Sequence, residues 1–523
     1  MDNPQPSLPG RHQDHPVQPA VLVDRSRIPD LATADVGGIA AGLAAGHFTS
    51  VELVEACLDR IEALSVGGPH LNAVRSINPD VYVEARQRDE QRSLSLVAGP
   101  LHGVPVLIKD NIDVVGLPTT AGSIALADSY PVGDAPLITR LKEAGAIILG
   151  KANLTEFANF MANAMPSGYS SLGGQVLNPY NASETPSGSS SGSAVAVAAG
   201  LAPLAVGTET SGSILSPAHA NSVVGVKPTV GAVSRTGIVP ISATQDTAGP
   251  MTKTVHDAAV LLAAMVSIDP QDAATAANPL VGVDLVAGLS VDALQGVRLG
   301  YLDNDDALYG DALQVLRDQG AELIKVTVGE PEVDRILGSE FQRDLNAYLA
   351  RLPENAPMRT LAQIQQYNLD HPQALKFGQA AIDGALEVDL ADPAQREAYE
   401  KVRDRGVGES RTMIDSVLTE HRLAAVVSRS ETIGVGARAG YPSVSVPIGY
   451  AAGNHNPMAM TFLGSRWSDP MLLALAHAYE QASQLRRTPE EINPSLFRGA
   501  TVHDQWDATV LIPPRPDGDH RIA

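Results

Sequence analysis

Residues 185–200, TPSGSSSGSAVAVAAG, join a loop of hydroxyl residues to a run of small apolar residues. The apolar run, residues 194–199, suits a helix that packs closely against neighbours on all sides. The loop places hydroxyl and backbone N–H groups at the N-terminal end of this helix, where negative charge is stabilised. A flexible Ser/Gly linker would not lead directly into a core helix. We therefore interpret this stretch as part of a functional site.

Two other segments combine an apolar run with polar residues at its end. Upstream, residues 101–111 read LHGVPVLIKDN, and the strand-like run 104–108 leads to Lys109. Downstream, residues 207–218 read GTETSGSILSPA and contain a Gly/Ser turn around Ser213. Each feature alone has an ordinary explanation, because a lysine beside a strand usually extends to the surface and a serine in a glycine turn is usually a turn residue.

Together and in this order, the three segments resemble the amidase signature family of serine hydrolases. The resemblance covers roughly residues 31–487. Four further motifs carry it: GKANLTEF at 150–157, NPYN at 178–181, VVGVKPTVGAVSRTGIVPISATQDTAGPM at 223–251 and AGYPSVSVPIGY at 439–450. The segments 207–213 and 227–251 look most like those of peptide amidases, which hydrolyse the C-terminal carboxamides of peptides.

The resemblance implies a Ser-Ser-Lys triad that hydrolyses a carboxamide C–N bond through an acyl-enzyme and releases ammonia. It assigns the role of nucleophile to Ser213, of bridging serine to Ser189 and of base to Lys109. Backbone N–H groups of the Gly/Ser turn are the expected oxyanion donors: Thr210, Ser211, Gly212 and Ser213. A lysine acts as a base only when it is neutral, which requires burial or a nearby cation. Asp110 would oppose that shift, so we expect it to face away or to pair elsewhere.

The choice of bridging serine rests on the family's Gly-Gly-Ser-Ser-Gly-Gly-Ser pattern, because Ser187, Ser189, Ser190 and Ser191 are all candidates. Aligning that pattern places its first serine at Ser189, and the resemblance then implies a cis peptide bond between Gly188 and Ser189. The chain departs from the pattern where glycine is common, at Ser187, Ser191 and Ser211.

Another departure concerns the substrate. Leu215 stands where many members of the family carry arginine. Its apolar side chain disfavours acidic substrates and a glutamine-hydrolysing amidotransferase subunit, and it is compatible with the peptide amidases.

An alternative motif overlaps the same loop. Residues 188–192 match G-x-S-x-G, the nucleophile elbow of α/β-hydrolases, with Ser190 as the nucleophile. That motif needs a strand directly before it, but residues 183–186 read as a loop. It also needs a later Asp and His, and nothing marks any later histidine as catalytic. The elbow interpretation is therefore disfavoured.

Composition excludes several classes of protein. The chain has 523 residues, a hydrophobic fraction of 44% and a formal net charge of −22, so it can bury a large core but offers little attraction to nucleic acid or anionic membranes. Its one cysteine, Cys57, excludes an intrachain disulfide framework and fits a reducing compartment. No secretory signal, good transmembrane segment, metal motif or cofactor motif is found. We expect a cytoplasmic enzyme, without cofactor or metal, that acts on a small-molecule or peptide amide.

The order of elements predicts the fold class. Residues 103–206 alternate short apolar strands, such as 104–108 and 146–149, with helices, such as 136–143. This alternation favours an α/β fold with a mixed, largely parallel central sheet covered by helices. Thr49 and Glu52 form a capping box at the start of the first helix that the pattern predicts strongly.

Domain boundaries follow from composition. We expect a tail at 1–27, one domain at 28–510 with a mostly helical, variable region at about 331–421, and a second tail at 511–523. Aryl, aliphatic or carbamate substrates remain alternatives, because no motif marks the pocket walls. The alternative from another functional class is a binding protein that has this fold but no catalytic activity.

Overall fold

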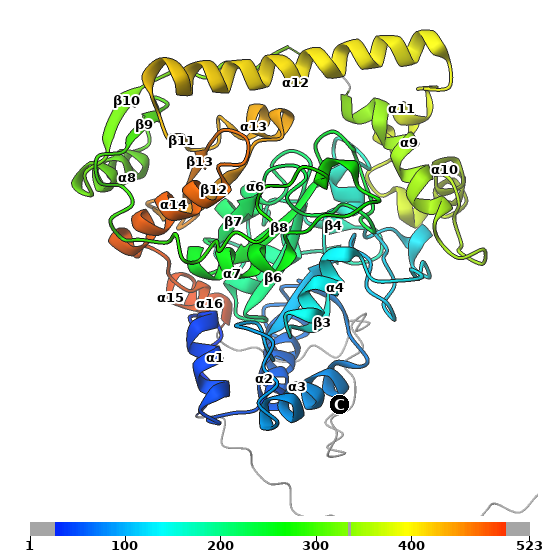
Figure 1. Ribbon diagram of the computed structural model, residues 1–523. Coiled ribbons are helices and arrows are strands. Elements are labelled where there is room, and N and C mark those ends of the chain that lie inside the picture. Colours follow the sequence, from blue (N-terminus) through cyan, green and yellow to red (C-terminus); the bar gives the residue numbers. More distant parts are fainter. Residues whose placement is uncertain (1–26, 333–335, 498–523) are drawn as a thin grey trace, which may run out of the picture.

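Eleven strands form the central sheet of the computed structural model, which describes residues 27–332 and 336–497 (Figure 1). In order across the sheet they are β1 (Val74–Ile77), β3 (Ile147–Ala152), β2 (Pro105–Lys109), β6 (Leu204–Glu209), β8 (Thr247–Thr252), β7 (Val224–Lys227), β12 (Ser443–Tyr450), β13 (Pro457–Leu463), β11 (Ala425–Ser428), β9 (Arg298–Tyr301) and β10 (Glu322–Lys325). A separate small sheet pairs β4 (Tyr169–Ser170) with β5 (Gly174–Gln175).

The central sheet is mixed, as the sequence predicts, but the expectation that it is largely parallel is wrong. Parallel pairing joins β3, β2 and β6 at one side and β11, β9 and β10 at the other. The remaining neighbours in the described sheet are antiparallel. The alternating segment 103–206 supplies the parallel strands β2, β3 and β6, because helix-containing crossovers return the chain in the same direction. The later pair β12 and β13 is antiparallel for another reason: only residues 451–456 separate the two strands, so they form a hairpin.

Helices cover the sheet in two groups that differ in their contacts. One group packs against the sheet and against itself: α4 (Pro136–Glu143), α7 (Val255–Met265), α8 (Ala307–Asp318) and α14 (Asp469–Ser483). The second group is α5 (Ser191–Ala198) and α6 (Leu215–Ala220), which contact each other; α5 also packs against β6, and α6 packs against β7, β12 and β13. Every residue of α5 is buried, which confirms the core helix expected after the serine loop.

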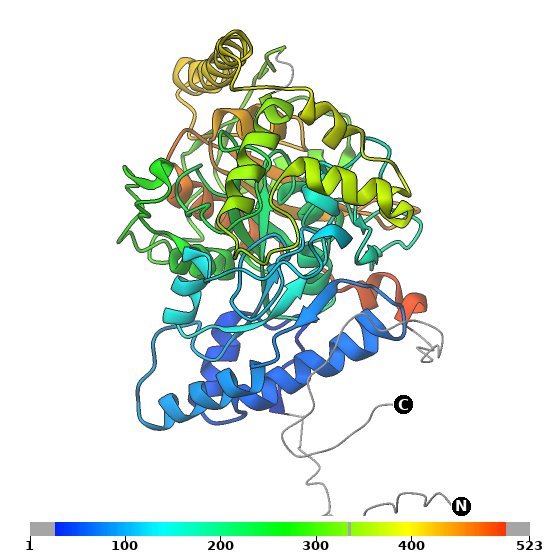
Figure 2. The ribbon, with the colours of Figure 1, turned by 90° about the vertical axis from the view of Figure 1, so that its right-hand side faces the viewer.

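The N-terminal helices lie together at one end of the molecule, at the bottom of both Figure 1 and Figure 2. They are α1 (Val36–Ala44), α2 (Ser50–Arg60) and α3 (Val81–Ser93). The capping box of α2 is present, because Thr49 accepts the Glu52 N–H and the Glu52 carboxylate accepts the Thr49 N–H. Cys57 is fully buried in α2, which raises the pKa of its thiol to about 12, so the side chain is part of the core.

The described residues of the region 331–421 contain four α-helices: α9 (Ile336–Ala350), α10 (Leu361–Asp370), α11 (Ala380–Leu386) and α12 (Pro393–His421). α12 is the long helix that crosses the top of the molecule in Figure 1 and is seen nearly end-on at the top of Figure 2. Apolar residues of α9, α10 and α11 form one buried cluster with Phe157, which follows β3, and Ile241, which precedes β8. These helices therefore pack against the loops beside the candidate site.

The remaining helices are α13 (Ile433–Ala439), α15 (Pro489–Ile492) and α16 (Pro494–Phe497). None of the described helices combines the length and the apolar composition that crossing a bilayer requires. The expected terminal tails, 1–27 and 511–523, lie outside the described residues except for residue 27.

Candidate active site

Lys109 is the last residue of β2 and lies at the centre of a buried polar network. The strand is buried along its whole length, and parallel pairing with β6 places its end beside Thr208. The Lys109 ammonium nitrogen lies 2.7 Å from the Ser189 hydroxyl, 2.9 Å from the Thr208 hydroxyl and 3.1 Å from the Thr208 carbonyl oxygen. The structure therefore brings together two of the three residues of the expected triad.

The environment of Lys109 favours its neutral form. Complete burial lowers the pKa of Lys109 from 10.5 to about 7, although the carboxylates of Glu209 and Asp246 act in the opposite direction. The neighbouring carboxylate of Asp110 is paired with groups other than Lys109. It accepts a hydrogen bond from Lys151 at 3.0 Å and another from the Thr120 hydroxyl. The expectation that Asp110 pairs elsewhere is confirmed.

Ser189 belongs to the loop that leads into α5. The peptide bond between Gly188 and Ser189 is cis, as the resemblance implies. The backbone carbonyl of Ser189 accepts the Thr155 N–H at 3.1 Å, which ties the loop to the segment after β3. The Ser189 side chain is fully buried. Its hydroxyl therefore faces Lys109 in a site from which bulk water is excluded.

Ser190 has a structural role that accounts for its burial. Its hydroxyl donates to the Thr208 carbonyl oxygen at 3.0 Å and accepts the Thr208 N–H at 3.2 Å. In the described chain, residues 176–190 form no strand, so the strand that a nucleophile elbow requires is missing. Both observations argue against Ser190 as the nucleophile.

Ser213 lies in the turn between β6 and α6. Its backbone carbonyl accepts the Ser190 N–H at 3.2 Å, so the turn contacts the serine loop directly. Among the described residues, no hydrogen bond joins the Ser213 hydroxyl to Ser189, so the structure places these two segments together without connecting their hydroxyls. Catalytic hydrogen bonds of this kind are often completed only when substrate binds.

The turn at residues 210–213 has free backbone donors. Gly212 has a φ of +83°, a conformation that residues with side chains rarely adopt, and a Cβ there would lie 2.9 Å from the Ser216 hydroxyl. Within the described part of the chain, the N–H groups of residues 210–213 have no hydrogen-bond acceptor. The next two N–H groups, of Ile214 and Leu215, instead donate to the buried Glu209 carboxylate at 2.8 and 3.0 Å. The turn can therefore offer donors to a developing oxyanion.

Residues 52–372 match the model of the amidase family. The chain belongs to the amidase family. A protein of Arabidopsis thaliana named as a probable amidase is 40% identical to it in an alignment of 467 residues that covers 85% of this chain and 89% of that protein.

Solved structures agree with this assignment. The peptide amidase of Stenotrophomonas maltophilia is similar with a TM-score of 0.81 and 42% identity, over 88% of this chain and 98% of that one. An amidase family protein of Bacillus anthracis is similar with a TM-score of 0.84 and 37% identity, over 88% of this chain and 92% of that one. The amidase is therefore an amide-hydrolysing enzyme with the α/β fold of its family.

Two polar residues of the amidase's site had no role in the sequence-based interpretation. Thr208 receives two hydrogen bonds from Lys109, and Asp246 accepts a hydrogen bond from the Thr210 hydroxyl at the start of the turn. Thr208 and Asp246 lie inside two of the motifs that carry the family resemblance, at 207–218 and 223–251, so the sequence did indicate the segments to which they belong. Their partners could not be inferred, because strand pairing and loop packing determine those contacts.

A small cavity adjoins this network and has a largely neutral lining. Its polar residues are Asn111, Thr208, Thr210, Asp246 and Thr247, and its apolar residues are Ala158, Ile238, Val239 and Ile241. Leu215 is fully buried and supplies no charge. In residues 27–332 and 336–497, no group of three or more His, Cys, Asp or Glu side chains is arranged to hold a metal ion.

Proposed function

We propose that this amidase hydrolyses the terminal carboxamide of peptides and N-acylated amino acids through a triad of Ser213, Ser189 and Lys109. The observation that carries the proposal is the buried 2.7 Å hydrogen bond between Lys109 and Ser189, at a lysine whose pKa is lowered to about 7. A substantial neutral fraction of such a lysine exists at neutral pH, and only the neutral amine can accept a proton.

The proposed reaction has two halves. In the first, neutral Lys109 takes the proton of Ser189 while Ser189 takes the proton of Ser213, and the Ser213 oxygen attacks the amide carbon. The tetrahedral oxyanion accepts hydrogen bonds from N–H groups of residues 210–213. The proton returns through Ser189 to the leaving nitrogen, the C–N bond breaks, and ammonia departs from the acyl-enzyme. In the second half, water replaces Ser213 as the nucleophile and the free acid is released.

The proposed substrate class rests on the neutral lining of the site and on similarity to a peptide amidase. Leu215, next to the turn, is apolar, and Lys109 is enclosed by Ser189 and Thr208, so neither residue offers a cation that would pair with an acidic side chain of the substrate. The solved structure from Stenotrophomonas maltophilia is named as a peptide amidase, and it covers nearly the same length. Aryl, aliphatic or carbamate substrates are the alternatives that the following experiment separates.

Incubation of the amidase with an uncharged N-acetylated peptide amide is expected to yield the free acid and ammonia, with internal peptide bonds intact. This expectation requires a pocket that is closed behind the reacting carbonyl, so that it admits an NH₂ group but no further residue. Mass spectrometry of the products and an ammonia assay measure both outcomes. A matched peptide that ends in a free carboxylate serves as the control and is expected to stay uncleaved.

Two results would contradict this proposal. Internal cleavage of either peptide would show an endopeptidase, and turnover restricted to aryl amides or carbamates would place the enzyme in another substrate class. A protein that binds the peptide amide but hydrolyses neither it nor aryl amides, aliphatic amides or carbamates would indicate an inactive binding protein.

A further inference from the structure

One face of α9 contacts the two loops that flank the site. Glu340, Asp344 and Tyr348 recur at intervals of four residues, so their side chains lie on the same face of the helix. Asp344 accepts the Ala243 N–H at 2.7 Å, and the Tyr348 hydroxyl donates to Asp113 at 2.7 Å. The helix belongs to the region 331–421, to which the sequence-based interpretation assigns no role, yet this face contacts segments on both sides of the candidate site.

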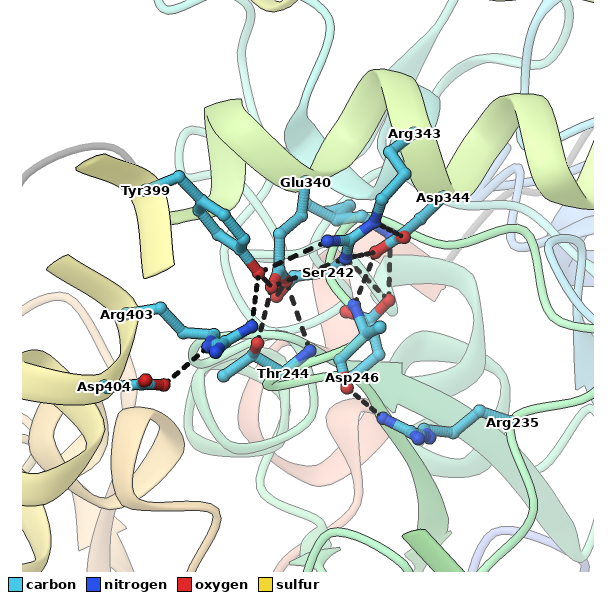
Figure 3. Close-up of polar contacts among 12 residues, drawn as sticks. Arg235, Ser242, Thr244, Asp246, Glu340, Arg343, Asp344, Tyr399, Arg403 and Asp404 are labelled. Atoms are coloured by element: carbon cyan, nitrogen blue, oxygen red, sulfur yellow. Dashed lines mark hydrogen bonds and ion pairs between the residues drawn. The ribbon is translucent and has the colours of Figure 1, made fainter. Parts of the chain in front are cut away.

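Glu340 makes the densest of these contacts, as Figure 3 shows. Its side chain is 1% exposed and accepts hydrogen bonds from the hydroxyl groups of Ser242 and Thr244 and from the Thr244 N–H at 3.2 Å. The hydroxyl of Tyr399, on α12, donates a further hydrogen bond. Arg343 adds a contact between its guanidinium and the carboxylate at 3.5 Å.

This environment keeps Glu340 ionised. Burial raises the pKa of the carboxyl group, but the hydrogen bonds from Ser242, Thr244 and Tyr399 outweigh it, so the pKa of Glu340 is lowered. A buried carboxylate with several donors holds them in a narrow range of geometries, because each donor that leaves would expose a costly unpaired charge. Residues 242–244 are thereby fixed to α9.

The segment fixed by Glu340 continues directly to the oxyanion turn. The Asp246 carboxylate accepts the N–H groups of Ile241 and Ser242, both at 2.9 Å, and the hydroxyl of Thr210. The side-chain amide of Gln245 donates to the Thr210 carbonyl oxygen at 3.0 Å. Thr210 is thus held from both its side chain and its backbone, and it is the first residue of the turn that carries Ser213.

We propose that Glu340 is a positioning residue, through which the helical region 331–421 holds the segment 241–246 and thereby the oxyanion turn at 210–213. The inference rests on the proposed function, because it assigns the turn to oxyanion binding. Stabilisation of an oxyanion depends on donors that are fixed before the reaction, so a turn that moves by a fraction of an ångström loses transition-state binding. Ground-state binding of the substrate depends less on that alignment, so kcat should fall more than KM changes.

The test compares Glu340→Ala and Glu340→Gln in the full-length amidase, with hydrolysis of the peptide amide measured well below the unfolding temperature of each variant. We expect Glu340→Ala to lower kcat by about 10- to 100-fold with KM within about threefold of the unsubstituted enzyme, which is the loss typical of a misplaced catalytic group. Glu340→Gln retains an acceptor oxygen and should recover part of kcat. Asp404→Asn is the matched control, since Asp404 forms an exposed ion pair with Arg403 beside Tyr399 and should leave kcat unchanged.

A second readout separates this inference from the choice of substrate. The rate at which a fluorophosphonate probe labels Ser213 also depends on the oxyanion turn, and it should fall in Glu340→Ala in parallel with kcat. An unsubstituted enzyme that labels but leaves peptide amides intact would refute the proposed substrate class, and the labelling rates would still test Glu340.

The inference is overturned if folded Glu340→Ala keeps the kcat and the labelling rate of the unsubstituted enzyme, even with a lowered unfolding temperature, because Glu340 would then only stabilise the fold. If Glu340→Ala does not fold, Ser242→Ala removes one donor of the carboxylate from the other side of the contact, and the same criteria apply to it.

Discussion

Replacement of Ser213 by alanine is expected to abolish amide hydrolysis while the fold stays intact. In the proposed mechanism the substitution removes the oxygen that attacks the amide carbon, and the loss of the nucleophile of a serine hydrolase triad lowers kcat by about a million-fold. The Ser213 hydroxyl makes no hydrogen bond to Ser189 in the described structure, so its removal should change the free energy of unfolding little. Ammonia release from a peptide amide and urea unfolding of the same sample measure the two effects.

The control for Ser213→Ala is Ser211→Ala in the same turn. Ser211 is exposed, and alanine keeps its backbone N–H, so hydrolysis should stay near that of the unsubstituted enzyme. A fluorophosphonate probe followed by peptide mapping should find the label on Ser213. A label on Ser190, or substantial hydrolysis by Ser213→Ala, would refute the assignment of the nucleophile.

Replacement of Lys109 by methionine should lower kcat by several orders of magnitude, because methionine fills a similar volume but accepts no proton. In the proposed mechanism the neutral lysine is the active form, and burial lowers the pKa of Lys109 to about 7. The value of kcat/KM should therefore fall about tenfold for each pH unit below 7 and reach a plateau above it. A series of kcat/KM measurements between pH 5 and 9 records this acid limb.

Asp110→Asn is the comparison for Lys109→Met. It leaves the buried Lys151 without its carboxylate partner, so it should lower the free energy of unfolding, by about 3 kcal/mol for a broken buried pair, while the folded fraction keeps most of its activity. Near-normal hydrolysis by Lys109→Met at neutral pH would exclude the Ser-Ser-Lys mechanism. A kcat/KM that stays constant down to pH 5 would show that Lys109 does not act as the titrating base.

The local elements of this amidase could be predicted wherever a short segment contains the whole signal. The capping box at Thr49 starts α2, and Pro136 starts α4 at the residue where the pattern places it. The direction of the strands in the second half could not be predicted in this way. The direction of a strand depends on the length of the connection that leads to it and on which edge of the sheet is still unpaired. The sequence of the strand itself contains neither piece of information.

The sequence by itself determined the family and the α/β class, and it predicted the residues that would carry the chemistry. It could do so because Lys109, Ser189 and Ser213 each lie in a contiguous motif whose residues must be adjacent along the chain. Only the tertiary structure decided that Lys109 contacts Ser189, and that burial lowers its pKa to about 7. It alone also placed Glu340 against Ser242, which is 98 positions away in the chain. Desolvation and long-range hydrogen bonds arise from tertiary packing. Packing brings together segments that are far apart in the chain, and the sequence of one segment does not indicate which other segment it contacts.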